Sequence, residues 1–112
     1  MTAARLKAGL WVRAHLRRAE TEGAAAFVVR KGDETAGVVL IRLNRLDGTA
    51  TVLTPTTGMD GNREWLRGTG PEPVADAEAD AYVERQLKYD PDLWVIEIED
   101  REGRHFLDEK VV

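Results

Sequence analysis

Four side chains near the N-terminus have the types and the spacing of a binding site for an anionic partner. They recur at intervals of four and three residues and so share one face of a helix: Lys7, Trp11, His15 and Arg18. Cationic groups beside an aromatic ring suit phosphates and nucleic acids, because charge supplies affinity and the ring can stack on a base. Trp11 can instead pack against a second layer or a twin subunit, with the cationic tips in water. We favour packing or a subunit contact, then an acidic protein partner, and place nucleic acid last.

A second group combines the same residue types. Arg63, Trp65 and Arg67 alternate along a segment that we expect to be a short strand, so their side chains share one face. They could line a groove for an anionic group. We favour the alternative, an edge strand whose Trp and Arg side chains discourage or direct pairing with another strand. The predicted interaction surface comprises Lys7, Trp11, His15, Arg18, Arg63, Trp65 and Arg67.

Two carboxylates lie close together near the C-terminus. Glu97 and Glu99 would project from one face of a strand, about 7 Å apart. Such a pair can hold a divalent cation or serve in acid–base chemistry. Alternating glutamates are commoner on a solvated strand face, where Arg101 or Arg104 across a hairpin would neutralise them. We favour the solvated face.

The two histidines are far apart in the sequence. His15 and His105 each lack a partner at the spacing of metal ligands. A site of two histidines and a carboxylate is geometrically possible, but a surface or capped histidine is the ordinary outcome. We therefore predict no metal site.

Residue types that are missing exclude several reaction classes. The chain has no cysteine and no serine, which excludes disulfides, thiolate chemistry and Ser/His/Asp hydrolysis. The glycine-rich stretches 58–62 and 68–70 do not match a phosphate-binding loop. We predict no catalytic residue and no cofactor.

Length and charge constrain the class of protein. A chain of 112 residues fits one domain, residues 1–112. Residues 1–70 hold 11 basic and 7 acidic side chains, and residues 71–112 hold 5 basic and 13 acidic ones. The two halves either face each other within one fold or a homodimer, which we favour, or present a basic face to an anionic partner. No apolar stretch approaches the roughly 20 residues of a membrane helix, and the start lacks a secretory signal, so we expect a cytoplasmic protein.

The N-terminal half predicts a helix and three strands. The helix spans Arg5 to Glu22. Ala24–Lys31 and Gly37–Asn44 are expected to form a hairpin, and the second of these to be central because Val38 to Ile41 is continuously apolar. An Asp-Gly turn then leads into a third strand at Thr49–Thr54. The apolar arc of the helix is predicted to comprise Leu6, Gly9, Leu10, Val12, Leu16 and Ala19.

The C-terminal half predicts one helix and a hairpin. Asp76 can cap the helix, which Pro91 ends. Leu93–Asp100 alternates as a half-buried strand, and Arg104–Leu107 is expected to return beside it after a turn. The predicted fold is a two-layer α+β domain: an antiparallel sheet, made of a meander and a C-terminal hairpin, with both helices on one face.

Several segments resemble one bacterial family, the proteins of DUF1491. They cover nearly the whole chain: Leu6–Val12, Leu43–Gly48, Trp65–Leu66, Gly70–Val74 and Asp90–Asp100. The resemblance implies a bacterial single-domain protein of about this length. It implies no activity, ligand or catalytic residue.

Three functional hypotheses follow. The favoured one is a non-enzymatic binding or accessory module that homodimerises or docks a protein partner through Trp11, Trp65 or an exposed sheet edge. The second is a domain for a small molecule or nucleotide, with an anionic ligand in a cleft lined by Arg63, Arg67, Glu97 and Glu99. The third is RNA binding through the first helix.

Overall fold

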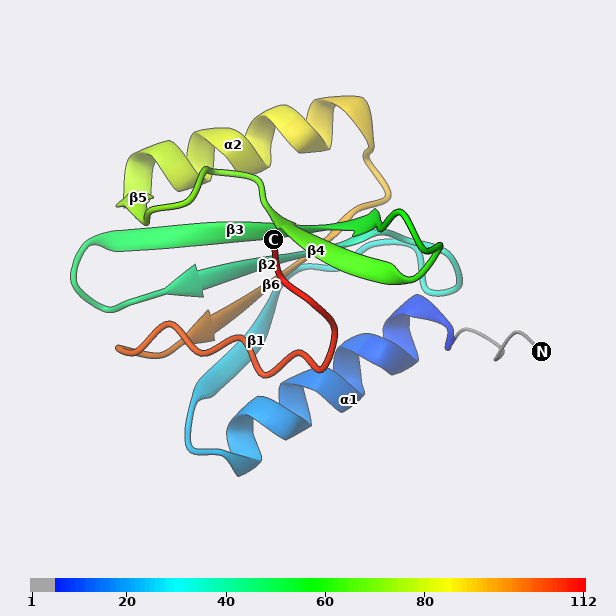
Figure 1. The fold of residues 1–112 in the computed structure, drawn as a ribbon, viewed down its shortest axis with the longest axis horizontal. Coiled ribbons are helices and arrows are strands. Elements are labelled where there is room, and N and C mark those ends of the chain that lie inside the picture. Colours follow the sequence, from blue (N-terminus) through cyan, green and yellow to red (C-terminus); the bar gives the residue numbers. More distant parts are fainter. Residues whose placement is uncertain (1–5) are drawn as a thin grey trace.

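The computed structural model describes residues 6–112, in which one mixed sheet of six strands lies between two helices (Figure 1). In chain order the elements are α1 (Ala8–Thr21), β1 (Ala25–Arg30), β2 (Val39–Asn44), β3 (Thr49–Thr57), β4 (Arg63–Arg67), β5 (Val74–Ala75), α2 (Asp76–Tyr89) and β6 (Trp94–Glu99). The strand order is β1-β6-β2-β3-β4, and β5 pairs with β3. The α+β class with two helices is confirmed.

Strand β2 lies at the centre of the sheet because its side chains are apolar on both faces. Ile41 and Leu43 join the core beneath α1, whereas Leu40 joins a second core beneath α2. Since each core contains residues of a different helix, the two helices cover opposite faces of the sheet (Figure 1). The prediction that both helices share one face is wrong, and the domain has three layers.

The expected hairpin between the first two strands is also wrong. Strand β6 lies between β1 and β2, antiparallel to β1 and parallel to β2, so the sheet is mixed. Burial explains this order: Trp94, Val95 and Ile96 are at most 3% exposed, and only a central position covers them on both faces. The turn-like residues 32–36 belong to a connection from β1 to β2 that passes over the intervening strand β6. Composition alone does not distinguish such a connection from the tight turn of a hairpin.

The C-terminal hairpin is absent from the described residues. Asp100 accepts hydrogen bonds from the backbone and guanidinium of Arg104, which closes a turn. Phe106 then adopts a positive φ of 61° and the chain leaves the sheet instead of forming a strand. It crosses between α1 and β4 (Figure 1).

The two edges of the sheet differ. Along β4, Trp65 N donates to Lys110 O at 2.8 Å, Val112 N donates to Trp65 O at 2.7 Å, and Val111 forms a parallel bridge. We refer to residues 105–112 as the C-terminal segment. At the other edge, β1 pairs only with β6 within residues 6–112.

Helix α1 is oriented by a loop. It lacks a capping side chain, and its first amides donate instead to backbone carbonyls: Ala8 N to Thr35 O at 3.1 Å and Gly9 N to Glu34 O at 2.9 Å. The buried face is Ala8, Gly9, Val12, His15 and Ala19. Leu6 and Leu10 are about half exposed, so the predicted apolar arc is wrong at those two positions, and Arg5 lies outside the described residues. No helix between residues 6 and 112 has the length and apolar character to cross a bilayer.

Candidate binding site

Residues predicted separately on a helix and on a strand meet in one aromatic cluster. The Trp11 ring stacks on His15, with centroids 4.8 Å apart, and on Trp65 at 5.6 Å. The Arg63 guanidinium lies 5.7 Å from the centroid of Trp11 and 5.0 Å from that of Trp65. We call these four residues the tryptophan cluster. It joins α1 to β4.

Trp65 anchors the cluster. Its side chain is completely buried, and its Nε1 donates to Glu109 Oε1 at 2.9 Å. Trp11 is partly buried and packs against the same core. Trp11 therefore packs within the fold, with the β4 edge and the C-terminal segment as the second layer.

The C-terminal segment occupies much of the predicted cationic stripe. His15 Nε2 lies 2.8 Å from His105 O, and because a carbonyl only accepts, Nε2 carries the proton. Arg18 donates to Phe106 O at 3.0 Å and to Asp108 Oδ2 at 2.8 Å. Within this stripe, Arg18 thus already has an acidic partner in the same chain, Asp108 of the C-terminal segment.

A groove of about 740 Å³ lies beside Trp11. Its walls are the start of α1, the loop before β2 and the end of the β3–β4 hairpin, together with Glu109 of the C-terminal segment. Apolar groups line much of it, and Lys7 and Arg63 bring positive charge. A smaller hollow of about 260 Å³ shares Trp11 and Glu109 with the groove and continues along the C-terminal segment.

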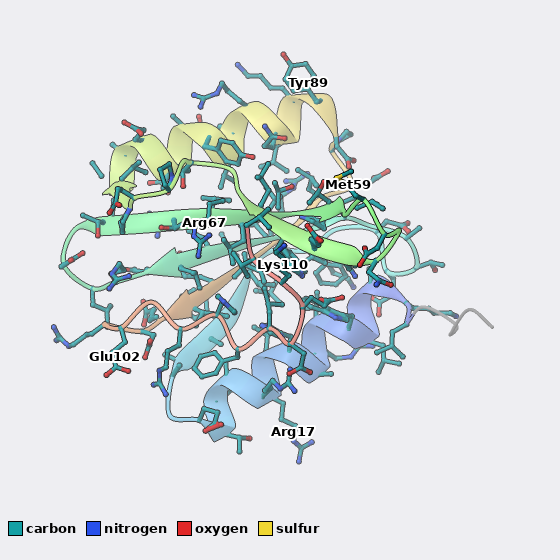
Figure 2. All side chains as sticks on the ribbon, in the orientation of Figure 1. Arg17, Met59, Arg67, Tyr89, Glu102 and Lys110 are labelled. Carbon is teal, nitrogen blue, oxygen red and sulfur yellow. The ribbon has the colours of Figure 1, made fainter. Side chains whose placement is uncertain are left out.

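The remaining predicted residues lie in different places. Arg67 is half-buried on the Trp65 side of β4 and raises the local positive charge near His105. Arg17, which was not among the predicted residues, points into solvent from the outer side of α1 (Figure 2). The histidine rings form no metal site, and among residues 6–112 no cluster of three or more potential ligands occurs.

Burial favours the neutral form of both histidines. Burial lowers the pKa of His15 from its usual 6.5, and the hydrogen bond to the His105 carbonyl only partly opposes this effect. Burial, with a contribution from the charge of Arg67, lowers the pKa of His105. The Nδ1 atom of His105 accepts from Leu107 N at 3.0 Å, which requires an unprotonated nitrogen.

Glu97, one member of the predicted carboxylate pair, has a structural role. Glu97 accepts from Arg42 Nη1 at 3.2 Å and from Asn44 Nδ2 at 3.1 Å, and its side chain is 13% exposed. The expectation of a solvated face is wrong for Glu97, because α2 covers that side. Its partner is Arg42 on the neighbouring strand, whereas Arg104 pairs with Asp100.

Arg42 is the centre of a network that sequence reasoning missed. Its guanidinium donates to Asp76 Oδ1 at 2.9 Å and to Asp80 Oδ1 at 3.1 Å as well as to Glu97. Burial opposes ionisation of Arg42, but the Asp76 hydrogen bond and the Glu97 and Asp80 charges outweigh it and raise its pKa. The signal was an arginine inside an apolar strand, with two aspartates four residues apart on a later helix. Asp76 opens α2 without capping it.

The cleft expected from Arg63, Arg67, Glu97 and Glu99 does not form. Arg63 lies on the α1 face, over the rings of Trp11 and Trp65. Glu97 lies on the α2 face, hydrogen-bonded to Arg42. The sheet separates the two groups. Ion pairs between the basic and acidic halves instead form within the fold, notably Arg18–Asp108 and Arg42–Asp76.

Comparisons with known proteins identify relatives. A family model described as "Protein of unknown function (DUF1491)" matches residues 6–108. A crystal structure of a DUF1491 family protein from Caulobacter crescentus CB15 is 47% identical, with a TM-score of 0.86 over 96% of this chain and 100% of that one. An NMR structure of a DUF1491 family protein from the same organism is 46% identical, with a TM-score of 0.83 over 98% and 99%.

A more distant solved structure extends the comparison. The solution structure of protein Atu0922 from A. tumefaciens is 33% identical, with a TM-score of 0.73 over 86% of each chain. No curated protein matches the chain. The match of the family model over most of the sequence, with close structural similarity over nearly the full length, shows that the chain belongs to the DUF1491 family of proteins of unknown function.

Proposed function

We propose that this protein is a non-enzymatic binding module that takes an extended acidic and apolar segment of a partner protein in the groove beside Trp11. The supporting observation is that the chain's own acidic C-terminal segment already lies against the continuation of that groove. There Asp108 accepts from Arg18 and Glu109 accepts from Trp65. The partner segment would likewise place its carboxylates against basic side chains, further along the groove near Lys7.

The shape of the groove supports a peptide. Trp11 forms a wall that the stacked His15 and Trp65 rings hold in one orientation, so little side-chain entropy is lost on binding. Ala8, Val38 and Val39 add apolar surface. Such a surface suits the alternate side chains of an extended segment.

The charge of the groove supports an acidic segment. Lys7 is exposed, Arg63 lines the groove beside Trp11, and Glu109 is the one carboxylate among the described lining residues, where it accepts from the Trp65 indole. Positive side chains around an apolar surface attract carboxylates and fix their register. A lysine-rich segment would gain neither effect.

A small anionic molecule is the alternative occupant. The groove volume falls within the roughly 300–1,000 Å³ of ordinary ligand pockets. A nucleotide would place its ring on Trp11 and its phosphate near Lys7 and Arg63. The protein segment is preferred because the C-terminal segment provides a polypeptide precedent on the adjoining surface.

Titration of isotope-labelled protein with synthetic capped peptides tests the proposal. A peptide that alternates aspartate and leucine should shift the amide signals of Lys7, Trp11 and Val38 saturably, and its lysine–leucine counterpart should not. Lys7→Glu should weaken binding about two- to fivefold, the value of one exposed ion pair. Lys88→Glu makes the same charge change on exposed α2 and should leave binding unaltered.

The outcomes separate the alternatives. Equal binding of the lysine peptide, or shifts confined to the α2 face, would contradict the proposal. If adenosine monophosphate shifts the groove amides and the acidic peptide does not, the small-molecule alternative replaces it. Without a response from either probe, the groove is not a binding site for these ligand classes.

A further inference from the structure

We infer that β1 is the surface at which two copies of this chain associate, edge to edge and antiparallel, to form one continuous sheet. The inference is independent of the groove, because β1 and β4 are opposite edges of the sheet.

The β4 edge is covered and the β1 edge is open. The C-terminal segment supplies hydrogen bonds along β4, including Arg67 N to Val112 O at 3.2 Å. Within residues 6–112, no strand lies along the outer side of β1. Proteins usually protect such an edge with charges or proline, because its unpaired backbone groups are a template for another strand. From Ala25 to Val29, β1 has neither.

The exposed side chains of β1 are apolar on both faces of the sheet. Phe27 is 44% exposed, Val28 41% and Val29 55%. Phe27 is the ladder partner of Glu97, which faces α2, whereas Val28 is the partner of Ile96, which faces α1. A strand paired along the edge would cover the side chains on both faces of β1 at once. A partner packed against a single face of the sheet would cover the side chains of that face alone.

The charges at the ends of β1 identify the occupant as a second copy. Glu20 and Glu22 precede the strand, and Arg30 and Lys31 end it, all of them exposed. Antiparallel pairing of two copies places the acidic end of each beside the basic end of the other. Parallel pairing would bring like charges together. A surface with apolar residues between opposite charges is complementary to itself about a two-fold axis.

The geometry of an antiparallel pair restricts the register. The backbone N–H and C=O groups of successive residues point alternately towards and away from the open edge of β1. Two residues that face each other across the two-fold contact must therefore differ in sequence number by an even number. A two-fold axis at Phe27 meets this condition: it opposes the two Phe27 rings and sets each Ala26 against Val28 of the other copy. The aromatic pair forms the centre, small residues oppose larger ones, and Lys31 comes beside Glu22 of the second copy.

The bulge between Val28 and Arg30 limits the length of the ladder. A short strand contact buries less than the roughly 1,200 Å² of standard interfaces and gives a reversible dimer. We expect concentration-dependent dimerisation, measurable by sedimentation equilibrium between about 10 μM and 1 mM.

Paired variants test the interface. Phe27→Lys should raise the dimer dissociation constant at least about tenfold, since it removes the central aromatic pair and sets two cations against each other. Leu66→Lys is the matched control, because Leu66 is 45% exposed on β4 at the opposite edge, and it should leave the constant unchanged. Thermal unfolding of both variants verifies that they are folded.

Charge reversal tests the antiparallel arrangement. Glu22→Lys and Lys31→Glu should each weaken the dimer, because each creates like-charge pairs at both ends of the two-fold contact. The double variant should restore it. A protein that stays monomeric up to about 1 mM would overturn the inference, as would a dimer that Leu66→Lys disrupts and Phe27→Lys does not. Failure of the double variant to restore dimerisation would overturn the proposed pairing.

Discussion

Arg18 Nη2 lies 2.8 Å from Asp108 Oδ2, an ion pair between residues 90 positions apart in the sequence. The pair joins α1 to the C-terminal segment. Both side chains are largely exposed, at 46% and 80%, so solvent screens their attraction. The part-buried hydrogen bond from Trp65 to Glu109 is one residue further along the same segment. The two contacts should therefore differ in their contributions to stability.

Neighbouring substitutions in the C-terminal segment should have unequal effects. Asp108→Ala should lower the free energy of unfolding by less than about 1 kcal/mol, because it removes an exposed ion pair. Glu109→Ala should lower it by about 1–3 kcal/mol, because the indole N–H of the completely buried Trp65 loses its acceptor. Urea denaturation of the two variants measures the difference. Equal losses would show that the Trp65 hydrogen bond is not the stronger anchor.

Stability should fall as the pH drops below about 6.5. Burial lowers the pKa of His15 and of His105 in the folded protein, so the unfolded chain binds more protons in this range. Both histidine contributions are fully present above pH 6.5 and are lost progressively towards the lower folded-state pKa values. Urea midpoints at pH 7.5, 6.5 and 5.5 measure the slope. His15→Gln should remove part of the dependence, and an unchanged slope in that variant would contradict the assignment to His15.

Sequence periodicity predicted where the strands lie in the chain better than it predicted which strands pair with one another. The alternation of Trp94, Ile96 and Ile98 identified a strand, but the expectation that it is half-buried is wrong, because Val95 on its other face is also buried. The apolar run around Ile41 identified a central strand. The parallel pairing of β2 with β6 could not be predicted from these patterns. It depends on α2, which crosses one face of the sheet and returns the chain to the position beside β2. The interaction of Trp11 with Trp65 was missed for the same reason: each was found locally, and the sheet brings them together.

Helix α1 shows how a local pattern misjudges burial. Leu10 fits the apolar arc but is 48% exposed, whereas His15 is 5% exposed, because the C-terminal segment covers the His15 side. Leu10→Glu should therefore change the free energy of unfolding by no more than about 0.5 kcal/mol. Val12→Ala, at a completely buried position, should cost about 2 kcal/mol. A large loss from Leu10→Glu, measured by urea denaturation, would indicate that Leu10 is covered in solution.

Arg42 should be the most sensitive charged residue of the sheet. Arg42→Met removes the cation that faces Asp76, Asp80 and Glu97, and leaves the 13% exposed Glu97 without its ion pair. The expected loss is about 3 kcal/mol, the lower end for a broken buried ion pair, because Asp76 and Asp80 still reach water. Asp80→Asn should cost less than about 1 kcal/mol, since Asp80 is 64% exposed. Adding Glu97→Gln to Arg42→Met should recover part of the loss, because glutamine is neutral and can still accept from Asn44. If the double variant is less stable than Arg42→Met, the uncompensated charge of Glu97 is not the cause of the destabilisation.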